Sequence, residues 1–319
     1  MSTLYLHIGL PKTASTFLQK TVFPLLDSFE YLCTPNADLL EDDYPFSTSL
    51  HRFFKQSPVV WRDLGETLFH ELFGSAPMQG KDVLVSDEGI GNKEPVTIKM
   101  HLSELNDLAN QWGFTQVRAF GSVRYQASRM ASSYAQVSDR RLGASQRDFE
   151  NWTRQWISDN YYRKGVRFEY DLLWQSLTDV LGEENVLLLP YELMKQDLPD
   201  FLKRCFIFLK RQDEGKRVTE QLLSGEDSAP KNARSTSSNT WALRRRTTRN
   251  AKVVRLRPSR MFNALGLPMR VALRWPDLAR EDNICLTPSL SREIMQKYEK
   301  SNRAFAAHID MDLSPYGYY

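Results

Sequence analysis

A chain of 319 residues, 41% of them hydrophobic, is long enough to bury a large core. Its formal net charge is only +3, so the overall charge does not indicate a nucleic-acid partner. The three cysteines, Cys33, Cys205 and Cys285, lack the spacing of a zinc site or a disulfide framework, and we expect a cytoplasmic protein. We expect no signal peptide, because the N-terminus has no basic stretch followed by a long apolar one. We expect no membrane span, because no stretch approaches about 18 consecutive apolar residues.

In chain order, four short apolar runs predict the buried strands of a parallel sheet, where hydrophobicity is continuous rather than alternating. The runs are Leu4–Ile8, Asp82–Val85, Gln116–Phe120 and Val186–Leu189. Apolar side chains that recur every three or four residues predict helices at Phe17–Val22, Leu102–Trp112, Tyr170–Leu181 and Ser289–Ile309. Strands alternating with helices predict an α/β fold, with a parallel sheet flanked by helices and a single domain over residues 1–319.

The segment around residues 224–260 has a different composition. Between Ser228 and Arg260 it carries ten Lys or Arg residues, no acidic residue and many Ser and Thr residues. Such a segment is either a solvated surface stretch or a flexible, electropositive lid over an anionic ligand, and composition alone does not choose between them.

The first predicted strand leads into a short stretch rich in small and hydroxyl residues, Gly9-Leu10-Pro11-Lys12-Thr13-Ala14-Ser15-Thr16. A strand, a tight turn and a helix N-terminus make an anion site, because unpaired backbone N–H groups and the helix dipole point outward there. The hydroxyl residues could serve only as helix caps, but capping does not require Lys12. The Walker A pattern of ATP and GTP sites is not matched, because no glycine directly precedes Lys12. The stretch therefore predicts a phosphate-binding loop for another ligand.

This loop resembles the 5′-phosphosulfate loop of sulfotransferases that use 3′-phosphoadenosine 5′-phosphosulfate (PAPS), which reads P-K-[ST]-G-[ST]-[ST]. The resemblance implies that PAPS binds to the six matching residues, Pro11, Lys12, Thr13, Ala14, Ser15 and Thr16. It also implies that Phe17, directly after the loop, packs against the adenine. Ala14 stands at the glycine of the family's pattern. Alanine is strained there if the backbone needs a positive φ, and it serves if the position only needs a small residue.

A second motif matches the 3′-phosphate site of the same family, an Arg at a strand end and a Ser eight residues later. Arg124 follows the third predicted strand, and Ser132 follows at that separation. Eight residues are just over two helical turns, so the two side chains can face one side, with Ser128 between them. Arg offers a planar fork of donors to phosphate oxygens. A solvated Arg at a helix start is the alternative.

The resemblance extends to the C-terminal part of the chain. The closing stretch "YEKSNRAFAAHIDMDLSPYGYY" is similar to that of bacterial members of the family. The stretch "PKNARSTSS" falls where such proteins carry a loop that closes over the nucleotide, which implies nucleotide contacts for Asn232, Arg234 and Ser235. The resemblance thus spans the chain and implies the P-loop-like fold of sulfotransferases.

A polar stretch, Ser86-Asp87-Glu88, follows the second predicted strand. Ligands of open α/β sheets bind beyond the carboxyl ends of strands, so this stretch should face the same site as Lys12 and Arg124. Related bacterial sulfotransferases often carry Glu here, and the resemblance implies that Glu88 is the base that takes the acceptor proton. Asp87 is the alternative base, and simple helix capping is the alternative role. Lys12 would also stabilise the charge on the bridging oxygen of the donor.

The sequence thus indicates a PAPS-dependent sulfotransferase that modifies a hydroxyl of a carbohydrate, a lipid or a secondary metabolite and releases adenosine 3′,5′-bisphosphate (PAP). We expect no metal, because the five histidines are scattered, and we expect His7 to be a core residue rather than a base. Two alternatives are a small-molecule kinase with a non-standard P-loop and a non-catalytic nucleotide-binding relative. No residue pattern specifies the small-molecule or glycan acceptor or the oligomeric state.

Overall fold

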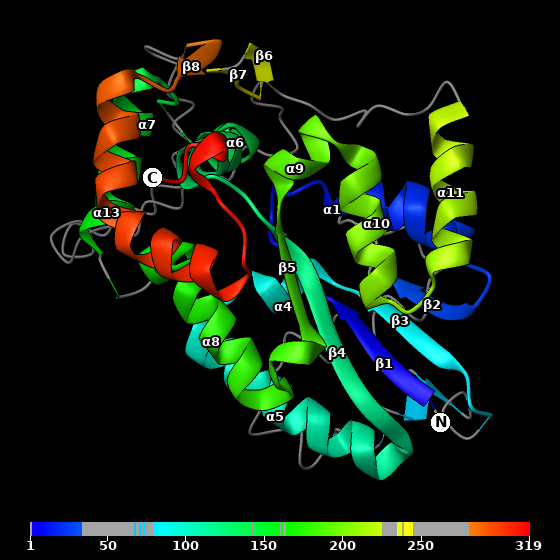
Figure 1. The fold of residues 1–319 in the computed structure, drawn as a ribbon. Coiled ribbons are helices and arrows are strands. Elements are labelled where there is room, and N and C mark those ends of the chain that lie inside the picture. Colours follow the sequence, from blue (N-terminus) through cyan, green and yellow to red (C-terminus); the bar gives the residue numbers. More distant parts are fainter. Residues whose placement is uncertain are drawn as a thin grey trace, which may run out of the picture.

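A parallel sheet forms the centre of the molecule (Figure 1). The computed structural model describes residues 2–33, 67, 70–71, 73–74, 79–141, 143–159, 161, 164–224, 235–237, 239–244 and 281–319. Within these residues, five strands pair in parallel in the order β2-β3-β1-β4-β5. They are β1 (Ser2–His7), β2 (Phe29–Cys33), β3 (Asp82–Ser86), β4 (Phe114–Val123) and β5 (Val186–Pro190).

The four predicted strands correspond to β1, β3, β4 and β5, which confirms the α/β fold with helices on both faces of a parallel sheet. The sequence analysis missed β2. This strand lies at the edge of the sheet, beside β3, and only its first residue, Phe29, is buried. An edge strand does not need a continuous apolar run, so periodicity did not reveal it.

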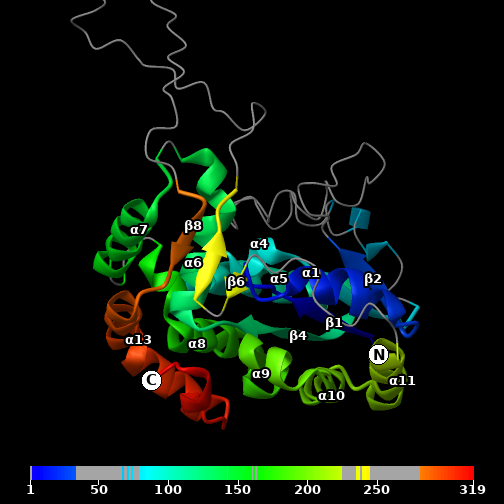
Figure 2. The same ribbon diagram turned by 90° about the horizontal axis from the view of Figure 1, so that it is seen from above.

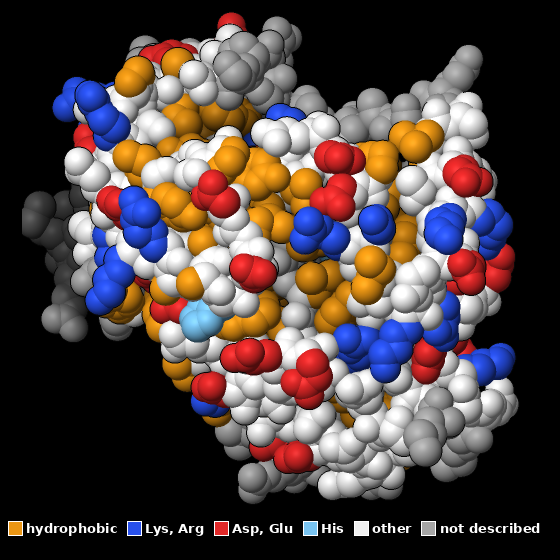
Figure 3. Space-filling model, viewed as in Figure 1, with side chains coloured by type: hydrophobic (Ala, Val, Ile, Leu, Met, Phe, Trp, Pro, Cys, Tyr) orange, Lys and Arg blue, Asp and Glu red, His pale blue; other side chains and the backbone are white. Residues whose placement is uncertain are grey.

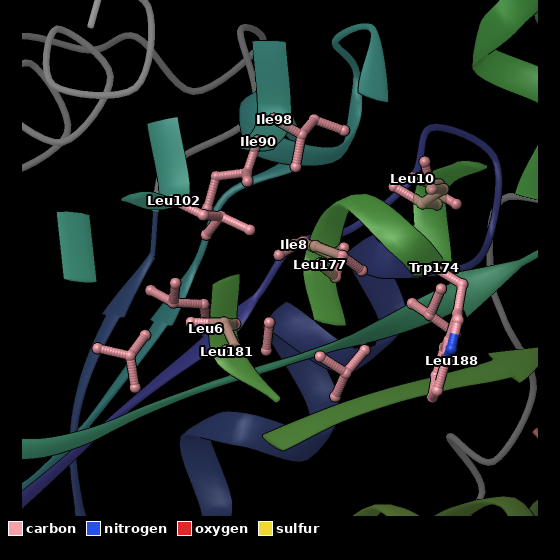
Figure 4. Close-up of a cluster of buried hydrophobic side chains, with 14 of the residues drawn as sticks. Leu6, Ile8, Leu10, Ile90, Ile98, Leu102, Trp174, Leu177, Leu181 and Leu188 are labelled. Atoms are coloured by element: carbon pink, nitrogen blue, oxygen red, sulfur yellow. The ribbon is translucent and has the colours of Figure 1, made fainter. Parts of the chain in front are cut away.

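One face of the sheet is covered by α5 (Pro95–Trp112), α8 (Tyr170–Leu181) and part of α13 (Pro288–His308). Figure 4 shows Leu6 of β1 and Ile8, which directly follows this strand, among side chains of these helices, including Ile98, Leu177 and Leu181. Gly113 and Gly182 end α5 and α8 with positive φ values of 103° and 83°.

The other face is covered by the segment after β1 and by three helices that follow β5. The segment consists of α1 (Ser15–Phe17), a π-helical stretch (Leu18–Val22) and a 3₁₀ turn (Phe23–Leu25) that contains Pro24. The helices are α9 (Tyr191–Gln196), α10 (Leu198–Phe208) and α11 (Gln212–Ser224). Tyr5, Leu84 and Phe120 of the sheet pack against them.

A third cluster lies beyond the sheet, where α6 (Gln126–Val137) packs with α7 (Gln146–Ser158) and α13. Three short strands of the described residues cover it: β6 (Ser235–Ser237), β7 (Thr240–Ala242) and β8 (Asn283–Cys285) (Figure 2). Trp241 of β7 and Ile284 of β8 are buried. Part of the predicted lid, residues 224–260, is therefore strand, while most of it lies outside the described residues and the lid stays a prediction.

On the face seen in Figure 3, basic and acidic side chains are interspersed among hydrophobic ones, in keeping with the small net charge. No helix within the described ranges combines the length and the apolar character needed to cross a membrane.

Candidate active site

The predicted site residues follow strands that end at the same edge of the sheet. The last residue of β1, His7, pairs with the last residue of β3, Ser86, and all neighbouring strands are parallel. The segments that leave β1, β3 and β4 carry Lys12, Glu88 and Arg124. The topology therefore gathers the three predicted segments at the carboxyl edge of the sheet.

The Lys12 loop has a backbone shaped to hold an anion. Lys12 and Ala14 have φ of 73° and 61°, and Thr13 between them does not share this left-handed conformation. Alternation of this kind turns successive N–H groups toward one concavity, which is a recurring anion-binding arrangement. Among the residues that the structure describes, the N–H groups of Thr13, Ala14 and Ser15 have no hydrogen-bond acceptor. These three donors are available to a phosphate.

The hydroxyls of Thr13 and Ser15 form hydrogen bonds within the loop. Thr13 Oγ1 donates to the carbonyl of Leu10 at 2.6 Å, and Ser15 Oγ donates to the same oxygen at 3.3 Å. Both side chains are buried. The hydroxyls thus close the turn, and Thr13 and Ser15 would meet a ligand through their backbone N–H groups. The half-buried Pro11 begins this turn.

The backbone at Ala14 shows whether this position of the motif needs a positive φ. Its φ of 61° and ψ of 24° are left-handed helical values, so the position needs the conformation that glycine adopts without strain. Alanine costs about 1–2 kcal/mol there. The loop nevertheless keeps this shape, because the Ala14 carbonyl accepts hydrogen bonds from the N–H groups of Phe17 (2.9 Å) and Leu18 (3.3 Å).

Arg124 reaches the Lys12 loop across the sheet edge. Its Nη1 donates to the carbonyl oxygen of Lys12 at 2.9 Å, although the two residues are 112 positions apart in the chain. Its Nε donates to Ser128 Oγ at 2.6 Å, and its guanidinium lies 4.8 Å from the ring centre of Tyr191. Burial lowers the pKa of Arg124, and the nearby Tyr191 and Glu192 act in the opposite direction. The two residues predicted to bind phosphates are therefore in direct contact.

The other residues predicted to contact the nucleotide lie in different surroundings, and two of them lie outside the described residues. Ser132 is buried on α6, one turn beyond the Ser128 that bonds Arg124. Phe17 is 7% exposed within the hydrophobic cluster on the sheet, which leaves little of its ring for an adenine, and its contact stays a prediction. Asn232 and Arg234 lie outside the described residues, and Ser235 is described only as part of β6.

Asp87 and Glu88 are neighbours in the chain, but their side chains have different surroundings. The Asp87 carboxylate caps the short helix α4 (Glu88–Gly91), accepting a hydrogen bond from the Gly89 N–H at 2.5 Å. Glu88 instead lies against the Lys12 loop. Burial raises the pKa of Glu88, the neighbouring Ser15 side chain and the charge of Lys12 lower it, and the charge of Asp87 raises it. The geometry therefore gives Asp87 the capping role and places Glu88 beside the predicted phosphosulfate loop.

Close backbone packing fixes α4 against the loop. The Gly91 N–H donates to the Ile8 carbonyl at 2.9 Å. A Cβ at Gly91 would lie 2.5 Å from that oxygen and 2.9 Å from the Gly9 carbonyl oxygen, so only glycine allows this approach. On the loop side, a Cβ at Gly9 would lie 3.2 Å from Glu88 Cγ. The position of the Glu88 side chain thus depends on two glycines.

His7 lies in the core, as its place on the first strand predicted. It is 1% exposed, and its Nδ1 is 2.6 Å from Ser86 Oγ, which also accepts a hydrogen bond from Gln19 Nε2 at 3.0 Å. Burial lowers the pKa of His7 to about 3, so the ring is neutral near pH 7. A metal site built from three or more His, Cys, Asp or Glu residues is not found within the described part of the chain.

The sequence analysis missed the residues that follow β5. Tyr191 lies beneath Arg124, and Glu192 accepts hydrogen bonds from the N–H of Tyr125 (3.1 Å) and the hydroxyl of Tyr318 (2.9 Å). Burial raises the pKa of Glu192. The rule that singled out the polar stretch after β3, a polar pair directly after a buried strand, applies equally to Tyr191 and Glu192 and would have found them.

Comparisons with known proteins bear on the fold. No family model and no curated protein matches the sequence. Among solved structures, the chain is similar to the crystal structure of a sulfotransferase from Alicyclobacillus acidocaldarius, with a TM-score of 0.51 and 14% sequence identity. The alignment covers 98% of this chain and 97% of that chain. The protein therefore has an α/β fold like that of this sulfotransferase, with a parallel sheet between layers of helices.

Proposed function

We propose that this protein transfers a sulfuryl group from PAPS to a hydroxyl of a small-molecule or glycan acceptor. The observation that carries the proposal is the 2.9 Å hydrogen bond from Arg124 Nη1 to the carbonyl of Lys12. A nucleotide with phosphates at both its 5′ and 3′ positions would meet both residues at once. The likeness of the fold to a sulfotransferase supports the same conclusion.

The loop would bind the 5′ end of the donor. The N–H groups of Thr13, Ala14 and Ser15 have no acceptor among the described residues, and the Lys12 ammonium adds a full positive charge. Such donors act most strongly on the charge that grows as the bond between sulfur and the bridging oxygen breaks. The donor itself supplies an activated sulfuryl group. At the other end, Arg124 and Ser132 would bind the 3′-phosphate.

Glu88 would act as the general base. It takes the proton of the acceptor hydroxyl while the acceptor oxygen bonds to sulfur and the electron pair of the broken S–O bond stays on the bridging oxygen. The products are a sulfate ester and PAP. A pKa raised by burial suits a carboxylate for this task, because proton transfer is most effective when the pKa of the base approaches the working pH.

Ligand selectivity tests the proposal directly. Thermal shift and calorimetry with PAP, adenosine 5′-monophosphate (AMP) and ATP with Mg²⁺ should show the tightest binding for PAP. An extract supplied with PAPS should then yield products heavier by one sulfuryl group in mass spectrometry. Preference for ATP would favour the kinase alternative, and PAP binding without product from any acceptor would favour the non-catalytic one.

A further inference from the structure

The link between β4 and α6 consists of Arg124 and Tyr125, and its backbone is held on both sides. The Arg124 carbonyl accepts a hydrogen bond from the hydroxyl of Tyr170 at 2.5 Å. The Tyr125 N–H donates to Glu192 Oε1 at 3.1 Å. Because the guanidinium extends from this link, its direction depends on the two bonds that fix the backbone.

The second oxygen of Glu192 connects the link to the end of the chain. Oε2 accepts a hydrogen bond from the hydroxyl of Tyr318 at 2.9 Å. Tyr318 is 0% exposed, and Asn302 Nδ2 donates to its carbonyl at 2.9 Å. Its ring centre lies 6.0 Å from that of Tyr125. In Figure 1 the C-terminal segment turns back from the end of α13 toward α6. The hydrogen bond to Glu192 then places Tyr318 beside this link.

The charge on Glu192 depends on its hydrogen-bond donors. Burial raises its pKa, whereas backbone N–H groups of Glu192 and Tyr125, the Tyr318 hydroxyl and the charge of Arg124 lower it. A buried carboxylate that loses a donor keeps the cost of desolvation without compensation. It is then a weaker and less fixed acceptor for the Tyr125 N–H. The Tyr318 hydroxyl therefore acts on the link through its hydrogen bond to Glu192.

We propose that Tyr318 is a positioning residue for recognition of the 3′-phosphate, acting through Glu192 on the Arg124–Tyr125 link. The chain's own C-terminal segment would thereby contribute to nucleotide selectivity. This inference rests on the proposed function, in which Arg124 binds the 3′-phosphate.

The variant Tyr318→Phe tests the inference because it removes only the hydroxyl. We expect its affinity for PAP to fall about tenfold, the effect of one lost hydrogen bond to a buried charge, while its affinity for AMP stays unchanged. The matched control is Tyr319→Phe. The Tyr319 hydroxyl bonds Asp312 at 3.1 Å and the Leu313 N–H at 3.2 Å in the same segment, away from Arg124. The Tyr319→Phe variant should keep the wild-type preference for PAP over AMP.

A double-mutant cycle shows whether the effect passes through Glu192. Glu192→Gln alone should also lower the preference for PAP over AMP, which keeps the inference testable if Tyr318→Phe does not fold. In the Glu192→Gln background, Tyr318→Phe should change the preference little further, because the two side chains act as one unit.

The outcomes separate the inference from the proposed function. If the wild type prefers PAP but Tyr318→Phe keeps that preference, or loses affinity for both nucleotides equally, the positioning role is wrong and the proposed function stands. If the two single variants act additively, the path through Glu192 is wrong. A wild type without preference for PAP over AMP would overturn both proposals.

Discussion

The two halves of the candidate site are built in different ways. The Lys12 loop is shaped by bonds within itself, such as those from Thr13 and Ser15 to the Leu10 carbonyl, no more than 5 positions away. Arg124 is held by side chains from distant parts of the chain: Tyr170 is 46 positions away, and Glu192 bonds the next residue from 67 positions away. The loop is a local structure, whereas the direction of Arg124 is a property of the assembled fold.

This contrast predicts that changes in the loop half act on turnover and changes in the Arg124 half act on selectivity. The largest effect is expected for Glu88→Gln, which removes the proposed base beside the loop. Turnover should fall by about 10²–10⁴-fold, the usual contribution of a general base, with PAP affinity nearly unchanged. Steady-state kinetics and calorimetry measure the two quantities.

The pH profile belongs to the same prediction. A base works in its ionised form, and burial raises the pKa of Glu88 above the ordinary 4.5. The value of kcat/KM should therefore fall as the pH is lowered through this raised pKa, and Glu88→Gln should lack that limb. If Asp87→Asn removes the limb while Glu88→Gln keeps it, the base is Asp87, despite its capping bond.

The next largest loss of turnover is expected for Lys12→Ala. Removing a donor to the developing charge lowers turnover by about 10²–10³-fold. The fold should persist, because the loop keeps its backbone bonds, and the melting temperature checks this. Lys216→Ala serves as a control, since its side chain is 75% exposed on α11. Undiminished turnover in Lys12→Ala would refute the role of the loop.

Arg124→Ala should act mainly on affinity. A hydrogen bond to a charged group contributes roughly 1.5–3 kcal/mol, so PAP binding should weaken by about 10–100-fold. The affinity for AMP, which has no 3′-phosphate, should fall much less. A moderate loss of turnover is also expected, because Arg124 bonds the Lys12 carbonyl and so joins the two halves. Equal losses for PAP and AMP in calorimetry would mean that Arg124 does not meet the 3′-phosphate.

The smallest effect is expected for Ala14→Gly. Glycine relieves a left-handed strain of about 1–2 kcal/mol, and greater freedom of the unfolded chain offsets about 0.4–1 kcal/mol of that gain. The free energy of unfolding should therefore rise by between about 0 and 1.6 kcal/mol, as measured by denaturant titration. A decrease would show that Ala14 adopts another backbone conformation in solution.

The sequence by itself determined the layered α/β fold and the place of the predicted Lys12 loop directly after the first strand. Continuous apolar runs specify buried strands, and the loop's bonds join residues that are close in the chain, so both are visible in short windows of sequence. Only the tertiary structure decided that Arg124 reaches Lys12, that Asp87 caps a helix while Glu88 faces the loop, and that Tyr318 supports Glu192 from 126 positions away. These contacts depend on how strands and helices are brought together, and no local pattern of residues records that arrangement.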